Sequence, residues 1–459
     1  MDLGSVPVSG KRIHRRNLVQ QTAYIFAGLL ASSLACLSIL HLTSPSIRAE
    51  TPGGATLDRP ESSKLVKGSL VIIGGSERFD NAAIWSTIVE LAGGRGGKIA
   101  VIPTASGYPV EYGTDIVRVL NQAGADAFIV PVALRGFDRD HKEVVSDPKL
   151  SDEVRQSDGV FFVGGEQSRI KQVLMDDAGN NTPLLDAIWD VYRHGGVIAG
   201  TSAGAAVMSR IMFRNGRSVL GTMLNGISMG REVDTGLGFM DPDWFVDQHC
   251  LVRGRFARAL VAMQKHGFRY GIGVDEDSAV VVQNDEARVI GYRGAIVMDL
   301  SEASSDDRLE HFNLKNAKLT YLDRGDSINL ETLEVTPSPE KASDRRVDPH
   351  APDFRPLFRH RIFSNDILGN TAVLDVMYKL LDNRHDEAFG LAFDGAAARL
   401  GPVDGFEFRF FRDADTMGWE TESFGGDDYT IVNIHLDITP IRLTGPLYLK
   451  ETDAAPEMP

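Results

Sequence analysis

"GGVIAGTSAGAAVMS", residues 195–209, is an apolar run that breaks at Gly200-Thr-Ser-Ala-Gly204 and then continues as the start of a helix. A continuous apolar run is typical of a strand that is covered on both faces of its sheet. Ser202 stands at the expected turn from strand to helix, where a serine either caps the helix or attacks a substrate. The rest of the chain has to distinguish these two roles.

Short apolar strands alternate with amphipathic helices on the N-terminal side of this stretch. We expect strands in "SLVIIGGSE", "KIAVIPTAS", "AFIVPVAL" and "GVFFVGGE", and helices in "AAIWSTIVELAG", "YGTDIVRVLNQAGA", "SRIKQVLMD" and "PLLDAIWDVYRHGG". This alternation predicts an α/β domain over residues 68–300, with a parallel sheet and helices on both faces. Sites in such sheets form at the carboxyl ends of strands, where Gly74-Gly75, Gly164-Gly165 and Gly200 to Gly204 fall.

The pattern changes after residue 300. "KLTYLDRGDSINLETLEVTP" indicates a β-hairpin, and "SPEKASDRRVDPHAPDFRP" a charged connector. The helical stretch "NTAVLDVMYKLLDN" then precedes alternating strands such as "FEFRFFRD" and "YTIVNIHLDITPIRL". Residues 301–459 are therefore predicted to form a smaller α+β or β-rich extension.

The N-terminus has the layout of an export signal. A basic stretch at 11–16 precedes an apolar run at 24–40, and small residues lead to Ala49. This order is typical of secretory signals, and Arg15-Arg16 resembles a twin-arginine signal. We expect a signal over 1–49, a polar linker over 50–67, and a secreted or periplasmic protein. An uncleaved anchor is the alternative; cleavage would leave no stable membrane association.

The charge of the chain limits its binding partners, and its cysteine content limits its disulfide bonds. The net charge of −15 and the pI near 5.2 argue against a nucleic-acid partner or an anionic membrane, because both would repel the surface. Cys36 lies in the expected signal, so Cys250 would remain alone. We therefore expect no intrachain disulfide in the exported chain.

The segment Gly200 to Gly204 fits G-x-S-x-G, the pattern of a nucleophile elbow. Small flanking residues are needed there because a side chain would collide with neighbouring elements. The following stretch, "AAVMSRIM", is expected to be a helix whose N-terminus faces the developing oxyanion. The N–H of Ala203 would be one oxyanion donor.

A second group of polar residues lies in "WFVDQHCLVRGRFARALVAMQ", residues 244–264. Asp247, Gln248 and His249 stand at an expected strand end. A helical pattern from Leu251 onward would place Arg255 and Arg258 on one face, with Arg253 nearby. Histidine suits the role of base for a serine, and arginines bind carboxylates in bidentate fashion. The alternative is a packed histidine beside solvated arginines.

Four motifs together resemble the cyanophycinases, in the peptidase family that also holds peptidase E. They are "GTSAGAAVMS", "FVGGEQSRI", "DQHCLVRGRFARALVAM" and "GIGVDEDSAVVV", within residues 68–300. The resemblance implies a class I glutamine-amidotransferase-like (flavodoxin-like) fold and no metal or cofactor. It implies a serine exopeptidase that cleaves cyanophycin, multi-L-arginyl-poly-L-aspartate, into β-Asp-Arg dipeptides. It also suggests a homodimer, and the signal and extension suggest a secreted branch.

The resemblance also assigns the site residues. Ser202 matches the nucleophile and His249 the base, and the N–H of Gly165 completes the oxyanion hole beside Ala203. The residues that match the substrate pocket are Gln167, Asp247, Gln248, Arg253, Arg255 and Arg258.

The acid that completes the triad is harder to assign. Residues 203–231 contain no Asp or Glu, so Glu232 is our choice and Asp234 the alternative. The run Asp275-Glu276-Asp277 is expected to be structural rather than a metal site, with a minor role near a substrate guanidinium. Rival interpretations are an aspartyl or isoaspartyl peptidase, an α/β-hydrolase-type esterase and a non-catalytic polymer-binding protein.

Overall fold

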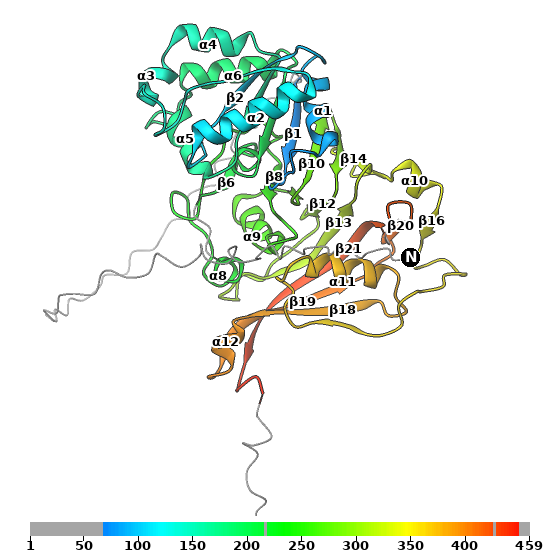
Figure 1. The fold of residues 1–459 in the computed structure, drawn as a ribbon. Coiled ribbons are helices and arrows are strands. Elements are labelled where there is room, and N and C mark those ends of the chain that lie inside the picture. Colours follow the sequence, from blue (N-terminus) through cyan, green and yellow to red (C-terminus); the bar gives the residue numbers. More distant parts are fainter. Residues whose placement is uncertain (1–67, 215–217, 426–427, 449–459) are drawn as a thin grey trace, which may run out of the picture. The chain divides into compact units, whose positions relative to one another are not determined.

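The computed structural model describes residues 68–214, 218–425 and 428–448 (Figure 1). The predicted export signal (1–49) and linker (50–67) lie outside these ranges. No helix within them has both the length and the apolar character needed to cross a membrane.

The first sheet has nine strands in the described part of the chain, in the order β15-β14-β11-β10-β1-β5-β4-β2-β3. Its parallel strands are β1 (Ser69–Ile73), β2 (Lys98–Ile102), β3 (Asp126–Ile129), β4 (Gly159–Phe162) and β5 (Val197–Thr201). Its antiparallel strands are β10 (Ser278–Gln283), β11 (Glu286–Gly291), β14 (Ser327–Asn329) and β15 (Val335–Thr336). The predicted parallel sheet is thus the larger part of a mixed sheet.

Helices cover both faces of this sheet, because successive side chains of its strands point to opposite sides. Leu70 and Ile72 belong to a core that also contains apolar residues of α3 (His141–Val145), α4 (Pro148–Arg155), α5 (Gln167–Leu174) and α6 (Pro183–Arg193). Val71 and Ile73 belong to a second core, with α1 (Ala82–Leu91) and α2 (Pro109–Ala123). The predicted α/β class is confirmed.

The second sheet is mainly antiparallel, and α9 (Phe256–His266) and α11 (Ala372–Leu381) share its apolar core. Its strands, in spatial order, are β17 (Ile362–Ser364), β18 (Glu387–Phe393), β19 (Val403–Phe411), β21 (Asp428–Leu443), β13 (Leu314–Leu322), β12 (Ala295–Asp299), β9 (Tyr270–Val274) and β8 (Trp244–Gln248). In addition, β20 (Met417–Thr421) pairs with β21, and β16 (Arg345–Val347) pairs with β20. β8 and β9 run parallel to each other. The β-rich character predicted for the C-terminal region is confirmed.

The expected boundary at residue 300 is not a break between sheets. β12 lies before it and β13 after it, and the two strands pair in one sheet. β14 and β15 return to the first sheet, where β14 pairs with β11. The hairpin predicted after residue 316 is therefore only β14–β15, because β13 belongs to the other sheet. Residues 62–459 form one compact unit.

Two helices are shorter than expected. α7 (Ala203–Ala206) has four residues, because the carbonyls of Val207 and Met208 accept from Leu237 and Met240 instead of from later helical residues. The chain then forms the ribbon β6 (Ile211–Phe213) and β7 (Val233–Thr235). α9 begins at Phe256 rather than at Leu251, because Gly254 has the left-handed φ of 57°. The remaining short helices are α8 (Val219–Asn225), α10 (Pro339–Ala342) and α12 (Gly395–Ala398).

Candidate active site

The candidate site lies where the carboxyl ends of strands from both sheets meet. Ser202 follows β5 of the first sheet, and His249 follows β8 of the second. The backbone N–H of His249 donates to the carbonyl of Gly74, directly after β1, at 2.9 Å. The backbone N–H of Ser202 donates to Ile73 at the end of β1, at 3.0 Å. The end of β1 therefore braces both residues.

Ser202 occupies a strained turn. Its φ is 51° and its ψ is −107°, which is rare for a residue other than glycine. Glycine is required on both sides: a Cβ on Gly200 would lie 2.4 Å from the carbonyl oxygen of Gly204, and one on Gly204 would lie 2.4 Å from that of Phe162. The Ser202 side chain caps no helical N–H, so the helix-cap interpretation is wrong.

A serine, a histidine and a carboxylate form a hydrogen-bonded chain at this turn. Ser202 Oγ lies 2.8 Å from Nε2 of His249, and Nδ1 of His249 lies 2.6 Å from Oε1 of Glu276. The His249 side chain is 7% exposed and that of Glu276 is 21% exposed. The hydroxyl therefore has a base within reach, and the base has a carboxylate that orients it.

The carboxylate at His249 is not the one that the sequence analysis chose. Glu232 accepts instead from the N–H of Ser228 at 3.0 Å and from Nε of Arg231 at 2.6 Å. Asp234, the alternative, pairs with Lys171. Glu276 comes into place because β9 ends beside β8, which the order of residues along the chain does not reveal.

Burial determines the protonation of the base. It lowers the pKa of His249 to about 4, and the nearby Arg253 guanidinium lowers it as well, against the opposing hydrogen bond to Glu276. Burial alone would raise the pKa of Glu276, but the bonds from His249 and Arg253 lower it overall. At neutral pH the site therefore holds a neutral imidazole beside an ionised carboxylate.

Two backbone amides are available for an oxyanion. Within the described residues, the N–H groups of Gly165 and Ala203 donate to no protein acceptor. Ala203 follows Ser202 directly, and a Cβ on Gly164 would lie 3.3 Å from Cβ of Ser202. Gly165 has a φ of 144°, and its own Cβ would lie 2.2 Å from the carbonyl oxygen of Ala105. Only glycine fits at position 165. The amide of Gly165 is bonded to Gly164, which lies beside Ser202.

The three predicted substrate-binding arginines have different surroundings. Arg258 is buried and forms a bidentate pair with Asp247, at 2.7 and 2.6 Å. Arg255 donates to Oε1 and to the backbone carbonyl of Gln248. Only Arg253 among them is exposed, its side chain at 49%, with Nη2 3.1 Å from Glu276.

Comparison with known proteins shows the family of this chain. The family model described as peptidase family S51 matches residues 70–290. A cyanophycinase of Geminocystis herdmanii is 34% identical over 286 residues, which are 59% of this chain and 96% of the relative. The chain belongs to peptidase family S51. It is a serine-type peptidase.

This S51 peptidase is also similar to a second curated relative and to one solved structure. A cyanophycinase of Nostoc sp. strain PCC 7120 is 29% identical over 309 residues, 66% of this chain and 96% of the relative. A solved structure described as a peptidase from an acI-B1 Actinobacterium is 22% identical, with a TM-score of 0.43, over 57% of this chain and 96% of that chain.

The remaining predicted residues of this peptidase lie around the same strand ends. Gln167 begins α5, and its amide donates to the backbone carbonyl of Phe213. The roles of two further residues, Glu276 and Gly75, were not predicted from the sequence. A Cβ on Gly75 would lie 2.4 Å from Cε1 of His249 and 3.1 Å from Cβ of Ser202. Both residues belong to segments that the sequence analysis quoted, at ends of strands.

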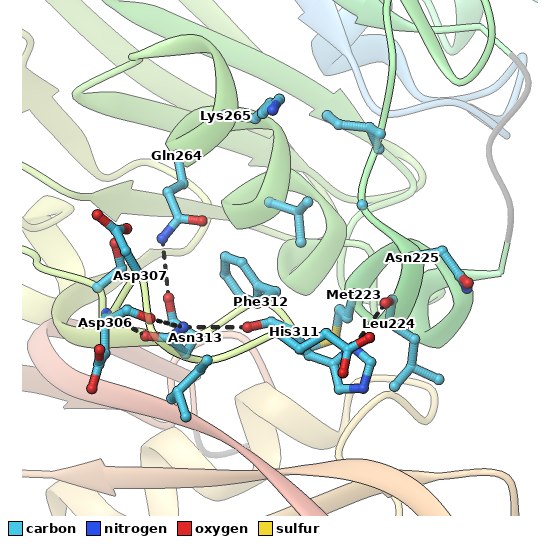
Figure 2. Close-up of a pocket in the computed structure, with 16 residues that line it drawn as sticks. Met223, Leu224, Asn225, Gln264, Lys265, Asp306, Asp307, His311, Phe312 and Asn313 are labelled. Atoms are coloured by element: carbon cyan, nitrogen blue, oxygen red, sulfur yellow. Dashed lines mark hydrogen bonds between the residues drawn. The ribbon is translucent and has the colours of Figure 1, made fainter. Parts of the chain in front are cut away.

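A separate cavity of about 580 Å³ lies between α8, the C-terminal half of α9 and the loop 305–313 (Figure 2). In it, Gln264 donates to the carbonyl of Asn313, and the amide of Asn313 donates to the carbonyl of Asp306. Its lining shares no residue with the Ser–His–Glu chain or with the predicted substrate pocket. We assign it no part in the chemistry of this peptidase.

Proposed function

We propose that this peptidase hydrolyses cyanophycin to β-Asp-Arg dipeptides, with Ser202, His249 and Glu276 as the catalytic triad. The observation that carries the proposal is the hydrogen-bonded chain from Ser202 Oγ through both nitrogens of His249 to Glu276. The substrate is inferred from the relatives named cyanophycinase, which align over nearly their whole length.

The reaction follows acyl-transfer chemistry. His249 takes the Ser202 proton as Oγ bonds to the carbonyl carbon of a backbone aspartyl unit. The N–H groups of Gly165 and Ala203 stabilise the oxyanion, and the turn acts as a nucleophile elbow. The C–N bond then breaks as His249 protonates the leaving amine. Water, deprotonated by His249, hydrolyses the acyl-enzyme and releases the product carboxylate and Ser202.

Arg253 is the group best placed to bind a carboxylate of the substrate. Each dipeptide unit of cyanophycin carries an arginine α-carboxylate, and an exposed guanidinium can bind it in bidentate fashion. Arg258 is held by Asp247 and Arg255 by Gln248, so we infer that these pairs shape the pocket wall.

The experiment incubates the purified chain with cyanophycin and identifies the products by mass spectrometry. β-Asp-Arg should appear, and Ser202→Ala should lower kcat by about 10⁴-fold or more. Ser86→Ala, on the exposed side of α1, is the control and should keep the wild-type rate.

Each rival interpretation predicts another result. Turnover of short esters without polymer cleavage would indicate an esterase, and cleavage of isoaspartyl dipeptides alone a related peptidase. Retention on insoluble cyanophycin without soluble product would indicate a binding protein. Full activity of Ser202→Ala would refute the catalytic assignment.

We propose further that the protein is exported to the periplasm or secreted, on the basis of the basic, apolar and small-residue order of residues 1–49. Replacement of Arg15 and Arg16 by lysine should leave the full-length chain inside the cell if the twin-arginine route is used. Cell fractionation and N-terminal sequencing of the exported protein measure this. Unchanged export would refute that route.

A further inference from the structure

The three acids that follow β9 form one of the crossovers between the two sheets. β9 belongs to the second sheet and β10 to the first, so Asp275, Glu276 and Asp277 are the whole connection. Their side chains have different partners: Asp275 pairs with Arg293, Glu276 with His249, and Asp277 with the loop that precedes α1. Glu276 is thus held between two anchored neighbours.

Asp277 accepts several hydrogen bonds from the loop before α1. The backbone N–H of Arg78 donates to Oδ1 at 2.9 Å, and Nδ2 of Asn81 donates to the same oxygen at 2.8 Å. Nε of Arg78 lies 3.1 Å from Oδ2. Nδ2 of Asn81 also lies 3.1 Å from the carbonyl oxygen of Asp277. These contacts hold Asp277 at a φ of 57°, in the left-handed region.

The contacts of Arg78 and Asn81 with Asp277 form a clamp, and the Asn81 side chain takes part in this clamp instead of capping its own helix. It stands at the N-cap of α1, where asparagine commonly accepts from a backbone N–H of the first turn. Its side chain makes no such bond and donates to Asp277 instead, and the residue is only 1% exposed. Asn81 is therefore buried at an N-cap position without capping its helix. We infer that its structural role is to bind Asp277.

The same loop, residues 74–81, touches all three members of the Ser–His–Glu chain or their direct neighbours. The carbonyl of Gly74 accepts from His249, and that of Gly75 accepts from Asp277 at 2.9 Å. The hydroxyl of Thr201, directly before Ser202, donates to Glu77. The Asp277 clamp therefore ties the Glu276 turn to the segment that already braces the serine and the histidine.

We propose that Asp277, clamped by Arg78 and Asn81, is a positioning residue that fixes the Glu276 carboxylate against Nδ1 of His249. The proposal rests on the triad of the proposed function, but not on the identity of the substrate. Without the clamp, the left-handed turn relaxes and Glu276 moves away from the imidazole. Displacement of a catalytic group by about 1 Å lowers the rate by up to about a hundredfold.

The test compares Asp277→Ala with wild type in the full chain. We expect kcat to fall between about tenfold and a hundredfold, with KM unchanged within about twofold, because the clamp touches no substrate group. Asp306→Ala is the matched control: Asp306 accepts from the backbone N–H and from Nε of Arg308, at 3.0 and 2.9 Å, in the loop of Figure 2. This control should keep the wild-type kcat.

A double-mutant cycle separates positioning from general damage. In a Glu276→Gln background, Asp277→Ala should have no further effect on kcat, because residues that act as a unit are not additive. Asn81→Ser is the second variant, since serine is a favourable N-cap residue for α1 but lacks the amide donor. It should lower kcat while the melting temperature stays at or above the wild-type value. It also keeps the test decisive if Asp277→Ala does not fold.

A second readout is independent of cyanophycin. A fluorophosphonate reacts with Ser202 through the same Ser–His–Glu geometry, so its inactivation rate should fall in parallel with kcat in both variants. If the wild type reacts with the reagent but leaves cyanophycin intact, the proposed substrate is wrong and the positioning role is still measured. Wild-type rates in both variants, or a multiplied loss in the Glu276→Gln background, would overturn the inference.

Discussion

Three residues other than glycine at the candidate site have a positive, left-handed φ. Ser202, His249 and Asp277 have φ values of 51°, 50° and 57°. Each such residue costs of order 1 kcal/mol or more, so the surrounding contacts have to hold it in place. The motif around Ser202 predicted its turn. The strain at His249 and Asp277 arises from contacts with the loop 74–81, far away in sequence, and no local pattern indicates it.

Gly75→Ala should abolish most activity, because the new Cβ would lie 2.4 Å from Cε1 of His249 and would displace the ring. We expect kcat to fall by about a hundredfold. Gly93→Ala is the matched control: its φ is 89°, close to the 102° of Gly75, but no atom lies within 4 Å of the new Cβ. Both variants should lose about 1 kcal/mol of stability from the positive φ, and only the first should lose activity. Kinetics and urea unfolding measure this; equal activities would contradict it.

Arg258 and Arg253 should separate stability from substrate binding. Arg258→Ala leaves the buried Asp247 carboxylate without its bidentate partner and should cost about 3–5 kcal/mol in the free energy of unfolding. Arg253→Ala removes a half-exposed guanidinium and should change stability by less than about 0.5 kcal/mol. KM for cyanophycin should rise about tenfold. Urea titrations and steady-state kinetics measure these effects. A larger loss of stability in Arg253→Ala than in Arg258→Ala would contradict the two roles.

The acid limb of the pH–rate profile should lie unusually low. The base works as neutral imidazole, and burial lowers the pKa of His249 to about 4. kcat/KM should therefore stay level as the pH falls through 6.5, the ordinary value for histidine, and should decline only near pH 4. A break near pH 6.5 in wild type would contradict this environment for His249.

At the scale of single elements, most strands were predicted from the sequence, but the ends of several helices were not. β1, β2, β4 and β5 were predicted because they are continuous apolar runs, which are typical of strands in a sheet covered on both faces. The start of α9 depends on the left-handed φ of Gly254. The end of α7 depends on hydrogen bonds that Leu237 and Met240, distant along the chain, donate to the carbonyls of Val207 and Met208. The choice of Glu232 failed for a similar reason, since strand pairing and not chain order brings Glu276 to His249.

The loop 74–81 should make stability depend on pH through Glu77. This residue is half-buried, and burial raises the pKa of its carboxyl to about 7 from 4.5. The folded state therefore holds a proton that the unfolded state releases between these values. This contribution to stability is complete below pH 4.5 and is lost as the pH rises through 7. Glu77→Gln should be more stable than wild type at pH 8, by of order 1 kcal/mol, and equal to it near pH 4.5. Urea unfolding at both pH values measures the difference in stability between Glu77→Gln and wild type. The same difference at pH 8 and at pH 4.5 would contradict a raised pKa for Glu77.

At the scale of the whole molecule, the two sheets depend on each other. The sequence shows a change of pattern after residue 300, but alternating strands do not reveal which sheet they join. β13 pairs with β12 and β21, and Phe256 of α9 packs against Phe408 of β19, with ring centroids 6.0 Å apart. The predicted C-terminal extension therefore completes the core beneath the candidate site.

A chain that ends at residue 300 should not fold. It would expose the apolar face of α9 and leave β12 and β11 without β13 and β14. We expect such a chain (68–300) to be insoluble or to lack a cooperative unfolding transition, while the chain 68–459 unfolds cooperatively. Circular dichroism and urea titration compare them. A folded, active fragment 68–300 would show that the extension is dispensable.

Ser202 follows a strand of one sheet, and His249 and Glu276 follow strands of the other. If these three residues are the catalytic triad proposed above, a partly folded chain should have no peptidase activity, because neither sheet alone carries all three. We therefore expect peptidase activity to appear only once both sheets have formed. Such an arrangement would protect the producing cell from proteolysis while the chain is being made.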